Sequence, residues 1–404
     1  MKRIAFVFPP LLPLPAVRGG ASETLIQRLI DDNENRGECL FHVYCRYDQE
    51  AENCSKRYKY TQFSYIKERE TLVDHVAFLW YRLRRKISKN YVPEPYIKAL
   101  TAKINKEIYD AVIVESSFRF IPYLKKKTNN KVMLHLHFDA VASKQKALEE
   151  GLRLCDGVVC VSHFIEKTIH NYDSSIPTYV LPNVTDVSRF DAGKYAKPVA
   201  EIKEKLGIEN EPVILYSGRL APLKGVLELV QAYKLALKQV PQMKMILAGS
   251  AGYGETTQDE YYDMLIEQIG DMKDKSIFLT GYVNHDQMPV YYALADVAVL
   301  PTTMVDEAAP LSVLEAQASG CYFIGSDSGA IPELMSPDYG SIVHRGEQYV
   351  KNLAEQLVLA AQRYRRIDYS QPTAGRRFVL KYHDGEKYFE NFLQLMKKIL
   401  RSDI

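Results

Sequence analysis

Short apolar runs alternate with longer amphipathic stretches along the first half of the chain. The short runs have the length of strands, and the longer ones place apolar residues at helical spacing. Strands are predicted at residues 3–8, 40–45, 111–115, 131–137, 157–161 and 177–181, and helices at 22–35, 71–89, 96–108 and 144–154. This alternation predicts a parallel sheet with helices on both faces.

A second series of the same kind begins near residue 212. Strands are predicted at 213–217, 244–248, 276–280, 296–300 and 321–325, and helices at 226–239, 285–294, 311–319 and 330–335. The segment 182–212 is polar and carries no predicted strand, so the linker lies near its start. The chain is therefore expected to fold as two doubly wound, Rossmann-like α/β domains that face a central crevice.

Composition limits the range of possible functions but does not identify one. The 404 residues are 47% hydrophobic and 25% charged, and the formal charge of +2 gives no reason to expect nucleic acid as a partner. The six cysteines form no C-x-x-C pair, and no signal peptide is recognised, which together favour the cytoplasm. Prolines interrupt the apolar run at the start, and no other stretch approaches the length of a membrane span.

Ligands of such sheets bind at the carboxyl ends of the strands, so the loops that follow strands are the places to look for chemistry. The first such loop, residues 217–225 (SGRLAPLKG), joins a predicted strand to a predicted helix. Arg219 and Lys224, with the positive end of the helix dipole, suit a diphosphate. The alternative is two solvated cations on a polar loop.

The segment 307–315 (EAAPLSVLE) also follows a predicted strand. Glu307 lies in the loop, and Glu315 lies near the start of the helix that Pro310 helps to begin. Both carboxylates can accept hydrogen bonds from the hydroxyls of a sugar or a ribose. The alternative is an acidic residue favoured by the helix dipole together with a solvated helical glutamate.

Two further loops belong to the first series. Gly19 and Gly20 precede the helix at 22–35, and glycines let backbone amides approach a phosphate closely. His135 and His137 point to the same side of their strand, and His137 is nearer its carboxyl end. An ordinary strand-to-helix turn and a hydrogen-bonded structural imidazole are the respective alternatives.

Taken in order, these segments resemble the retaining, nucleotide-sugar-dependent glycosyltransferases of the GT-B fold, and more narrowly the family usually numbered four, with its E-x7-E motif. The resemblance spans nearly the whole chain. It runs through Gly19–Gly20, His137, 181–190 (LPNVTDVSRF), 217–225, 281–301 (GYVNHDQMPVYYALADVAVLP) and 307–334 (EAAPLSVLEAQASGCYFIGSDSGAIPEL). Two positions depart from it: Ala309–Pro310 replaces a frequent Phe-Gly, and Glu115 stands where many relatives carry a histidine. The place of Glu115 at the end of a strand suits an acceptor-side role, and the alternative is a plain surface carboxylate.

The resemblance implies roles for single residues. Arg219 and Lys224 would bind the donor diphosphate, Glu315 the ribose and Glu307 the transferred sugar. His137 would contact that sugar near the reacting carbon. The catalytic set is then His137, Glu307, Arg219 and Lys224, and the donor-binding set is Gly19, Gly20, Arg219, Lys224, Val283, Glu307, Leu311, Ser312 and Glu315.

The resemblance also implies the domain boundaries and the reaction. Residues 1–185 would form the acceptor-side domain, residues 186–380 the donor-side domain, and residues 381–404 a helix that crosses back to the first domain. The enzyme would move a hexosyl unit, with retention, from a nucleotide sugar (UDP rather than GDP) to a hydroxyl of a glycan or a lipid-linked acceptor. Polysaccharide or glycoconjugate assembly is the expected setting. No D-x-D triplet occurs, so neither a metal nor another cofactor is expected.

Other interpretations stay open at this point. A sugar-nucleotide epimerase shares the architecture, and a non-catalytic sugar-nucleotide-binding subunit would carry similar loops. An NAD-dependent oxidoreductase fits least, because the glycine-rich fingerprint is absent. Residues 80–90 (WYRLRRKISKN) interleave basic and apolar side chains, which suits peripheral contact with the inner face of a membrane or, alternatively, a helix with a solvated basic face. The oligomeric state is not predicted.

Overall fold

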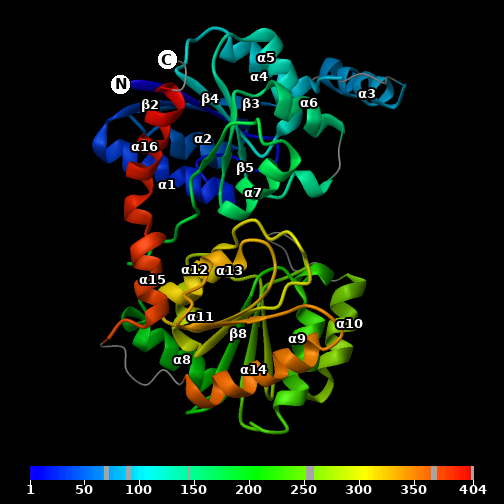
Figure 1. Cartoon of the computed structure of the whole chain (residues 1–404), viewed down its shortest axis with the longest axis vertical. Helices are drawn as coiled ribbons and strands as arrows, with labels where there is room; N and C mark the ends of the chain where they lie inside the picture. Colours follow the sequence, from blue (N-terminus) through cyan, green and yellow to red (C-terminus); the bar gives the residue numbers. More distant parts are fainter. Residues whose placement is uncertain (68–71, 88–91, 144–145, 252–258, 365–370, 402–404) are drawn as a thin grey trace. The chain divides into compact units, whose positions relative to one another are not determined.

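The computed structural model describes residues 1–67, 72–87, 92–143, 146–251, 259–364 and 371–401. The chain forms two compact units. Unit 1 comprises Met1–Asn183 together with Lys387–Ile404, and unit 2 comprises Val184–Glu386 (Figure 1). The linker expected near the start of 182–212 coincides with the passage from unit 1 to unit 2.

Unit 1 contains a seven-stranded, wholly parallel sheet in the order β3-β2-β1-β4-β5-β6-β7. Its strands are β1 (Lys2–Val7), β2 (Cys39–Arg46), β3 (Thr61–Ile66), β4 (Ala111–Glu115), β5 (Val132–Leu136), β6 (Gly157–Cys160) and β7 (Thr178–Val180). Its α-helices are α1 (Ala21–Arg36), α2 (Gln49–Ser55), α3 (Leu72–Ile87), α4 (Pro95–Ile104), α5 (Ile121–Lys127), α6 (Lys146–Leu154), α7 (His163–Tyr172) and α16 (Tyr388–Arg401).

Unit 2 contains a six-stranded parallel sheet in the order β10-β9-β8-β11-β12-β13. Its strands are β8 (Val213–Ser217), β9 (Lys244–Ala248), β10 (Ile277–Gly281), β11 (Val297–Leu300), β12 (Tyr322–Ser326) and β13 (Gly340–Val343). Its α-helices are α8 (Ala196–Leu206), α9 (Val226–Ala236), α10 (Glu260–Ile269), α11 (Met288–Leu294), α12 (Leu311–Ala318), α13 (Ile331–Leu334), α14 (Tyr349–Arg363) and α15 (Ala374–Tyr382).

The two sheets share one connectivity. Strand order β3-β2-β1-β4-β5-β6 in unit 1 corresponds to β10-β9-β8-β11-β12-β13 in unit 2. Strand order therefore reverses between β1 and β4 in one unit and between β8 and β11 in the other. In open parallel sheets such a switch point leaves room for a ligand beyond the carboxyl ends of the strands. The doubly wound α/β fold predicted for both halves is confirmed.

The hydrophobic pattern does not predict β3 and β13, and both lie at the edges of their sheets. Four of the six residues of β3 are at least partly exposed, and three of the four of β13 are, so neither forms a continuous apolar run. Central strands such as β4 are buried throughout, and the pattern locates them correctly. An edge strand packs less of its surface, and its sequence carries less of the signal.

Helix α16 packs on unit 1 through aromatic side chains. The ring of Phe392 lies 6.0 Å from that of Phe6 and 5.9 Å from that of Phe41. Phe389 adds an edge contact to Phe41 at 6.5 Å. These contacts show that α16 packs on unit 1. Of the helices that the structure describes, none is long and apolar enough to span a bilayer.

Candidate active site

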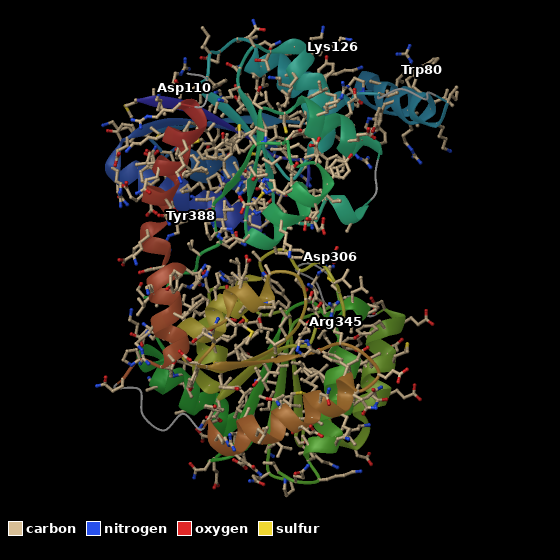
Figure 2. All side chains as sticks on the ribbon, viewed as in Figure 1. Trp80, Asp110, Lys126, Asp306, Arg345 and Tyr388 are labelled. Carbon is tan, nitrogen blue, oxygen red and sulfur yellow. The ribbon has the colours of Figure 1, made fainter. Side chains whose placement is uncertain are left out.

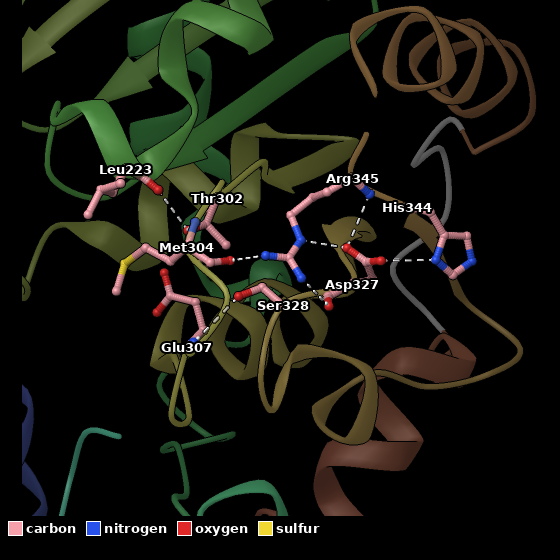
Figure 3. Close-up of polar contacts among 8 residues, drawn as sticks. All are labelled: Leu223, Thr302, Met304, Glu307, Asp327, Ser328, His344 and Arg345. Carbon is pink, nitrogen blue, oxygen red and sulfur yellow. Dashed lines mark hydrogen bonds and ion pairs between the residues drawn. The ribbon is translucent and has the colours of Figure 1, made fainter. Parts of the chain in front are cut away.

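In unit 2 the loops after β8 and β11 are joined at the switch point. The carbonyl oxygen of Leu223 accepts hydrogen bonds from Thr302 Oγ1 at 2.9 Å and from the Thr303 amide at 3.0 Å (Figure 3). Gly225 has φ 70°, and a Cβ there would lie 1.9 Å from the Pro301 carbonyl oxygen. Only glycine allows the start of α9 to approach the end of β11 this closely.

Lys224 and Glu307 meet across this junction. Lys224 Nζ lies 2.5 Å from Glu307 Oε1, and the side chains are 19% and 9% exposed. The structure thus brings together two predicted site residues that are 83 positions apart. Their burial contradicts the alternatives of a solvated lysine and of a glutamate favoured only by the helix dipole, because an ion pair held this far from water is a specific arrangement.

The backbone around Glu307 is fixed from the opposite side by the loop after β12. Its carbonyl oxygen accepts the Ala330 amide at 2.7 Å, and its amide donates to Ser328 Oγ at 3.4 Å. A Cβ on Gly329, which has φ 49°, would lie 2.1 Å from the Glu307 carbonyl oxygen. The carboxylate is consequently held by the backbone on one side and by Lys224 on the other.

Arg345 ties the Glu307 loop to β12 and was not found from the sequence. Its Nη1 donates to the Met304 carbonyl oxygen at 2.7 Å, and its Nε donates to Asp327 Oδ1 at 2.7 Å (Figure 3). Burial would raise the pKa of Asp327, but hydrogen bonds from Arg345 and His344 outweigh it and lower that pKa. Because Arg345 lies 41 positions from Met304, no local pattern could have found it.

Glu315 is buried in the second turn of α12. It is 6% exposed, so the alternative of a solvated helical glutamate is wrong. His285 Nε2 lies 2.8 Å from Glu315 Oε1, and this hydrogen bond raises the pKa of His285 against the opposing effect of burial. His285 sits within the segment 281–301 quoted above, but nothing in that segment indicated its contact with Glu315.

The remaining predicted residues of unit 2 lie in the loops after β8 and β10 and at the start of α12. Arg219 is exposed in the loop after β8, and its carbonyl oxygen accepts a hydrogen bond from Tyr216 Oη at 2.6 Å. Leu311 and Ser312 are the partly exposed first residues of α12, whose N-cap, Pro310, supplies no side-chain cap. Val283 is partly exposed in the loop between β10 and α11.

In unit 1, Gly19 and Gly20 form the loop between β1 and α1. Their φ angles are 73° and 101°, and Gly20 is the N-cap of α1 without a side-chain cap. A Cβ on Gly20 would lie 2.2 Å from Glu23 Oε2. Glu23 is 6% exposed, and burial raises its pKa.

His137 follows β5 and contacts the carboxylate that ends β4. His137 Nε2 lies 2.8 Å and His135 Nδ1 lies 3.0 Å from the same oxygen, Glu115 Oε2. Glu115 is 1% exposed and His135 2%. The alternative of a surface carboxylate at Glu115 is therefore wrong. Hydrogen bonding to His137 agrees with the structural-imidazole alternative and does not exclude a functional role.

The charge state of this cluster follows from its contacts. Burial alone would raise the pKa of Glu115, but the charge of His135 and the hydrogen bonds from both histidines lower it to about 2. Burial, followed by the charge of His135, lowers the pKa of His137, against the effect of Glu115. Within the described part of the chain this is also the group of three side chains whose ligand atoms, all within 4.8 Å of one another, could hold a metal ion.

Comparison with known proteins places these loops in a family. Residues 198–371, all within unit 2, match the family described as glycosyl transferases group 1. Unit 2 thus contains the region that is similar to the group 1 glycosyltransferases. The matched range contains Arg219, Lys224, Glu307 and Glu315, and the glycosyltransferase class predicted from the motifs is confirmed at this level. Assignment to family four is not tested by the match.

Similarity to known proteins extends over the rest of the chain. The chain is 25% identical over 416 residues to spore coat protein SA of Bacillus subtilis. The alignment covers 98% of this chain and 99% of that protein. The chain is 24% identical over 345 residues to lipopolysaccharide 1,2-N-acetylglucosaminetransferase of Salmonella typhimurium, with 83% of each chain covered. The Anabaena protein HepE, solved in complex with UDP-glucose, matches with TM-score 0.74 and 16% identity over 98% of this chain and 100% of that one, which supports the GT-B fold.

Proposed function

We propose that the protein is a retaining glycosyltransferase that moves a hexosyl unit from a nucleotide-diphosphate sugar, UDP-linked rather than GDP-linked, to a hydroxyl of a glycan or lipid-linked acceptor. The observation that carries the proposal is the buried Lys224–Glu307 pair at the switch point of unit 2. The group 1 family match and the UDP-glucose complex of HepE support it. Polysaccharide or glycoconjugate assembly in the cytoplasm is the proposed setting.

The Lys224–Glu307 pair can still form hydrogen bonds to a nucleotide-sugar donor. An ammonium group has three N–H donors, and Glu307 Oε1 uses one of them, so others remain for phosphate oxygens. The second oxygen of Glu307 can accept a hydroxyl of the transferred sugar. In this proposal Arg219 adds charge to the diphosphate site, Glu315 accepts the ribose hydroxyls, and Val283 lies near the base.

Backbone amides complete the proposed donor site. Pro310 has no N–H, so the amides of Leu311 and Ser312 at the start of α12 are the ones proposed to meet the sugar or diphosphate. Gly19 and Gly20 would approach the phosphate, and His137 would contact the sugar near the reacting carbon.

Leaving-group stabilisation is the chemistry that this arrangement suits. The departing diphosphate gains negative charge in the transition state, and fixed cations such as Lys224 and Arg219 lower the barrier electrostatically. The acceptor hydroxyl would lose its proton to the leaving phosphate on the same face, which retains the anomeric configuration. We propose that the reaction needs no metal. Activity that is lost with a chelator and restored by Mn²⁺ would contradict this.

The donor is identified by a thermal-shift panel of UDP, GDP, ADP and their sugar conjugates, followed by hydrolysis and transfer assays on each hit. We expect one nucleotide class to raise the melting temperature, with slow release of free sugar. Conversion of the donor without an acceptor to its epimer would favour an epimerase. Binding without any turnover would favour a non-catalytic subunit.

The role of Glu307 is tested separately. Glu307→Ala should reduce transfer to an extent that depends on the donor sugar, while the Kd of the free nucleotide changes little. Glu228→Ala, on the neighbouring helix α9, is the matched control. Equal loss of free nucleotide binding would give Glu307 a structural role.

We further propose that α3 is the membrane-contact segment, with the inner face of the membrane as its location. Figure 1 shows α3 extending away from the sheet of unit 1. Successive helical residues are about 100° apart, so its exposed large apolar side chains fall within an arc of about 100°. These are Val76, Leu79, Trp80 (Figure 2), Leu83 and Ile87, each at least 50% exposed.

The polar side chains of α3 fit an orientation in which the apolar arc faces the membrane. Exposed Arg84 lies on one side of the apolar arc, and exposed Lys86 and Arg82 lie on the other, where they can reach anionic headgroups. The opposite face carries Phe78 and Tyr81, which are partly buried. Residues 88–90 of the predicted basic segment lie outside the described residues.

Co-sedimentation with vesicles that contain an anionic lipid tests this contact. We expect wild type to bind and Trp80→Ser/Leu83→Ser to lose most of the binding. Ile108→Ser, which changes an 81% exposed apolar residue of unit 1 outside α3, is the control. Absence of binding at any salt concentration would contradict the proposal.

A further inference from the structure

The carboxylate of Glu115 determines how the His137 ring can act. An ionised carboxylate only accepts hydrogen bonds, so a ring nitrogen 2.8 Å from Glu115 Oε2 must carry the hydrogen. The His137 nitrogen at this distance is Nε2. A neutral imidazole has one N–H, so Nδ1 carries the lone pair.

His135 contacts the same carboxylate oxygen of Glu115. Its Nδ1 is 3.0 Å from Glu115 Oε2, so that oxygen receives two N–H groups. The second carboxylate oxygen, Oε1, and His135 Nε2 are buried without a hydrogen-bond partner among the described residues. Among the described residues, His135 and His137 are the ones that contact Oε2. His137 Nδ1 receives no hydrogen bond from a described residue, and its side chain is 12% exposed.

The separations favour hydrogen bonds over a shared metal ion. Ligand atoms placed 2.0–2.1 Å from a tetrahedral zinc ion stand about 3.3 Å apart. The two N···O separations here, 2.8 and 3.0 Å, are shorter than that and fall in the range of N–H···O hydrogen bonds. Cluster geometry therefore places hydrogens, rather than an ion, between the imidazoles and the carboxylate.

We propose that Glu115 is a positioning residue that holds His137 as the Nε2–H tautomer and thereby makes Nδ1 an acceptor for a substrate hydroxyl. The group that meets His137 is then an O–H donor, such as a sugar hydroxyl, and not a phosphate oxygen, which would need an N–H. Only the second part, contact with substrate, rests on the proposed function. The lowered pKa of His137 agrees with a neutral ring at neutral pH.

Two further titratable groups, Glu23 and Tyr388, interact electrostatically with Glu115. Glu23 on α1 and Tyr388 on α16 are both buried (Tyr388 is labelled in Figure 2). The negative charge of Glu115 contributes, after burial, to raising the pKa of each of them. Burial and the charge of Glu115 thus disfavour ionisation of Glu23 and of Tyr388.

The tautomer is measured directly by long-range ¹H–¹⁵N correlation on the full chain labelled with ¹⁵N-histidine, with His137→Gln to assign the signal. We expect the Nε2–H pattern in wild type and a substantial Nδ1–H population in Glu115→Gln. The control is Glu166→Gln, because Glu166 pairs with the exposed His163 at 3.0 Å outside the site. An Nδ1–H pattern in wild type, or an unchanged His137 tautomer in Glu115→Gln, would overturn the proposal.

Kinetics test the consequence for substrate. Glu115→Gln should lower kcat about 10- to 100-fold while the KM for the donor changes less than about 3-fold, and Glu166→Gln should change neither. Unchanged kcat in a variant with an altered tautomer would overturn the role in substrate contact. If wild type transfers no sugar from any donor, the proposed function fails, but the tautomer measurement still decides the role of Glu115. One bound metal per chain that is lost in Glu115→Gln would also overturn the proposal.

Discussion

The two units place a buried glutamate at the same point of the same topology and surround it differently. Glu115 ends β4, which pairs with β1, and Glu307 follows β11, which pairs with β8. In unit 2 the partner is the ammonium group of Lys224. In unit 1 the partners are two imidazoles, His135 and His137.

The two kinds of partner, an ammonium group and an imidazole, suit different ligands. A lysine paired to a carboxylate still presents N–H donors and positive charge, which suit phosphate oxygens. An imidazole that gives its hydrogen to a carboxylate presents a lone pair, which suits a hydroxyl. In our proposals one connectivity thus carries a site for an anion in unit 2 and a site for a neutral polar group in unit 1.

The largest effect is expected for Lys224→Met. Turnover should fall about 1,000-fold or more, because the leaving diphosphate loses a fixed cation. The variant should stay folded but lose up to about 3 kcal/mol of stability, because Glu307 is left buried without its partner. Adding Glu307→Gln should restore most of the stability and none of the turnover, as measured by denaturant unfolding and by single-turnover transfer. Near-normal turnover in Lys224→Met would remove Lys224 from the site.

A smaller loss is expected for Arg345→Met. Without the hydrogen bond to the Met304 carbonyl, the loop that carries Glu307 can shift, and displacement of about 1 Å can cost about 100-fold in rate. We expect kcat to fall about 10- to 100-fold. Arg363→Met, an exposed arginine on α14, is the control and should be near wild type. An equal effect of both substitutions would show that Arg345 acts through net charge alone.

Acid should weaken the cluster in unit 1. The pKa of Glu115 falls from 4.5 to about 2 on folding, so its contribution to stability is present above pH 4.5 and is lost as the pH falls toward 2. Wild type should therefore exceed Glu115→Gln in the free energy of unfolding near neutral pH, and this advantage should shrink below pH 4.5. Urea unfolding between pH 6 and pH 3 measures it. A constant difference would mean that Glu115 is not ionised in the folded protein.

The opposite pH dependence, and the smallest effect, is expected in unit 2. The pKa of His285 is raised from 6.5 by Glu315, so the stability from this pair is complete below pH 6.5 and is lost as the pH rises through the folded value. His285 has a 42% exposed side chain, so the contribution should be less than about 1 kcal/mol. Melting temperatures of wild type and His285→Gln should converge at alkaline pH. Divergence there would assign His285 another partner.

Much of the candidate site was identifiable from the sequence because its residues lie in loops whose flanking strands are strongly apolar. Lys224, Glu307 and Glu315 follow or start such elements, and the family match includes them. Arg345 and His285 were missed because each acts only through a residue distant in sequence. The edge strands β3 and β13 were missed because partial exposure weakens their pattern.

The sequence by itself determined the alternation of strands and helices, and with it the two doubly wound units and the loops that hold their chemistry. These features follow from local periodicity and chain length. Tertiary structure alone decided that Lys224 pairs with Glu307 and that His137 shares Glu115 with His135. Each of these depends on which buried polar or aromatic groups meet after the sheet has formed, because burial fixes their partners and no local pattern records it.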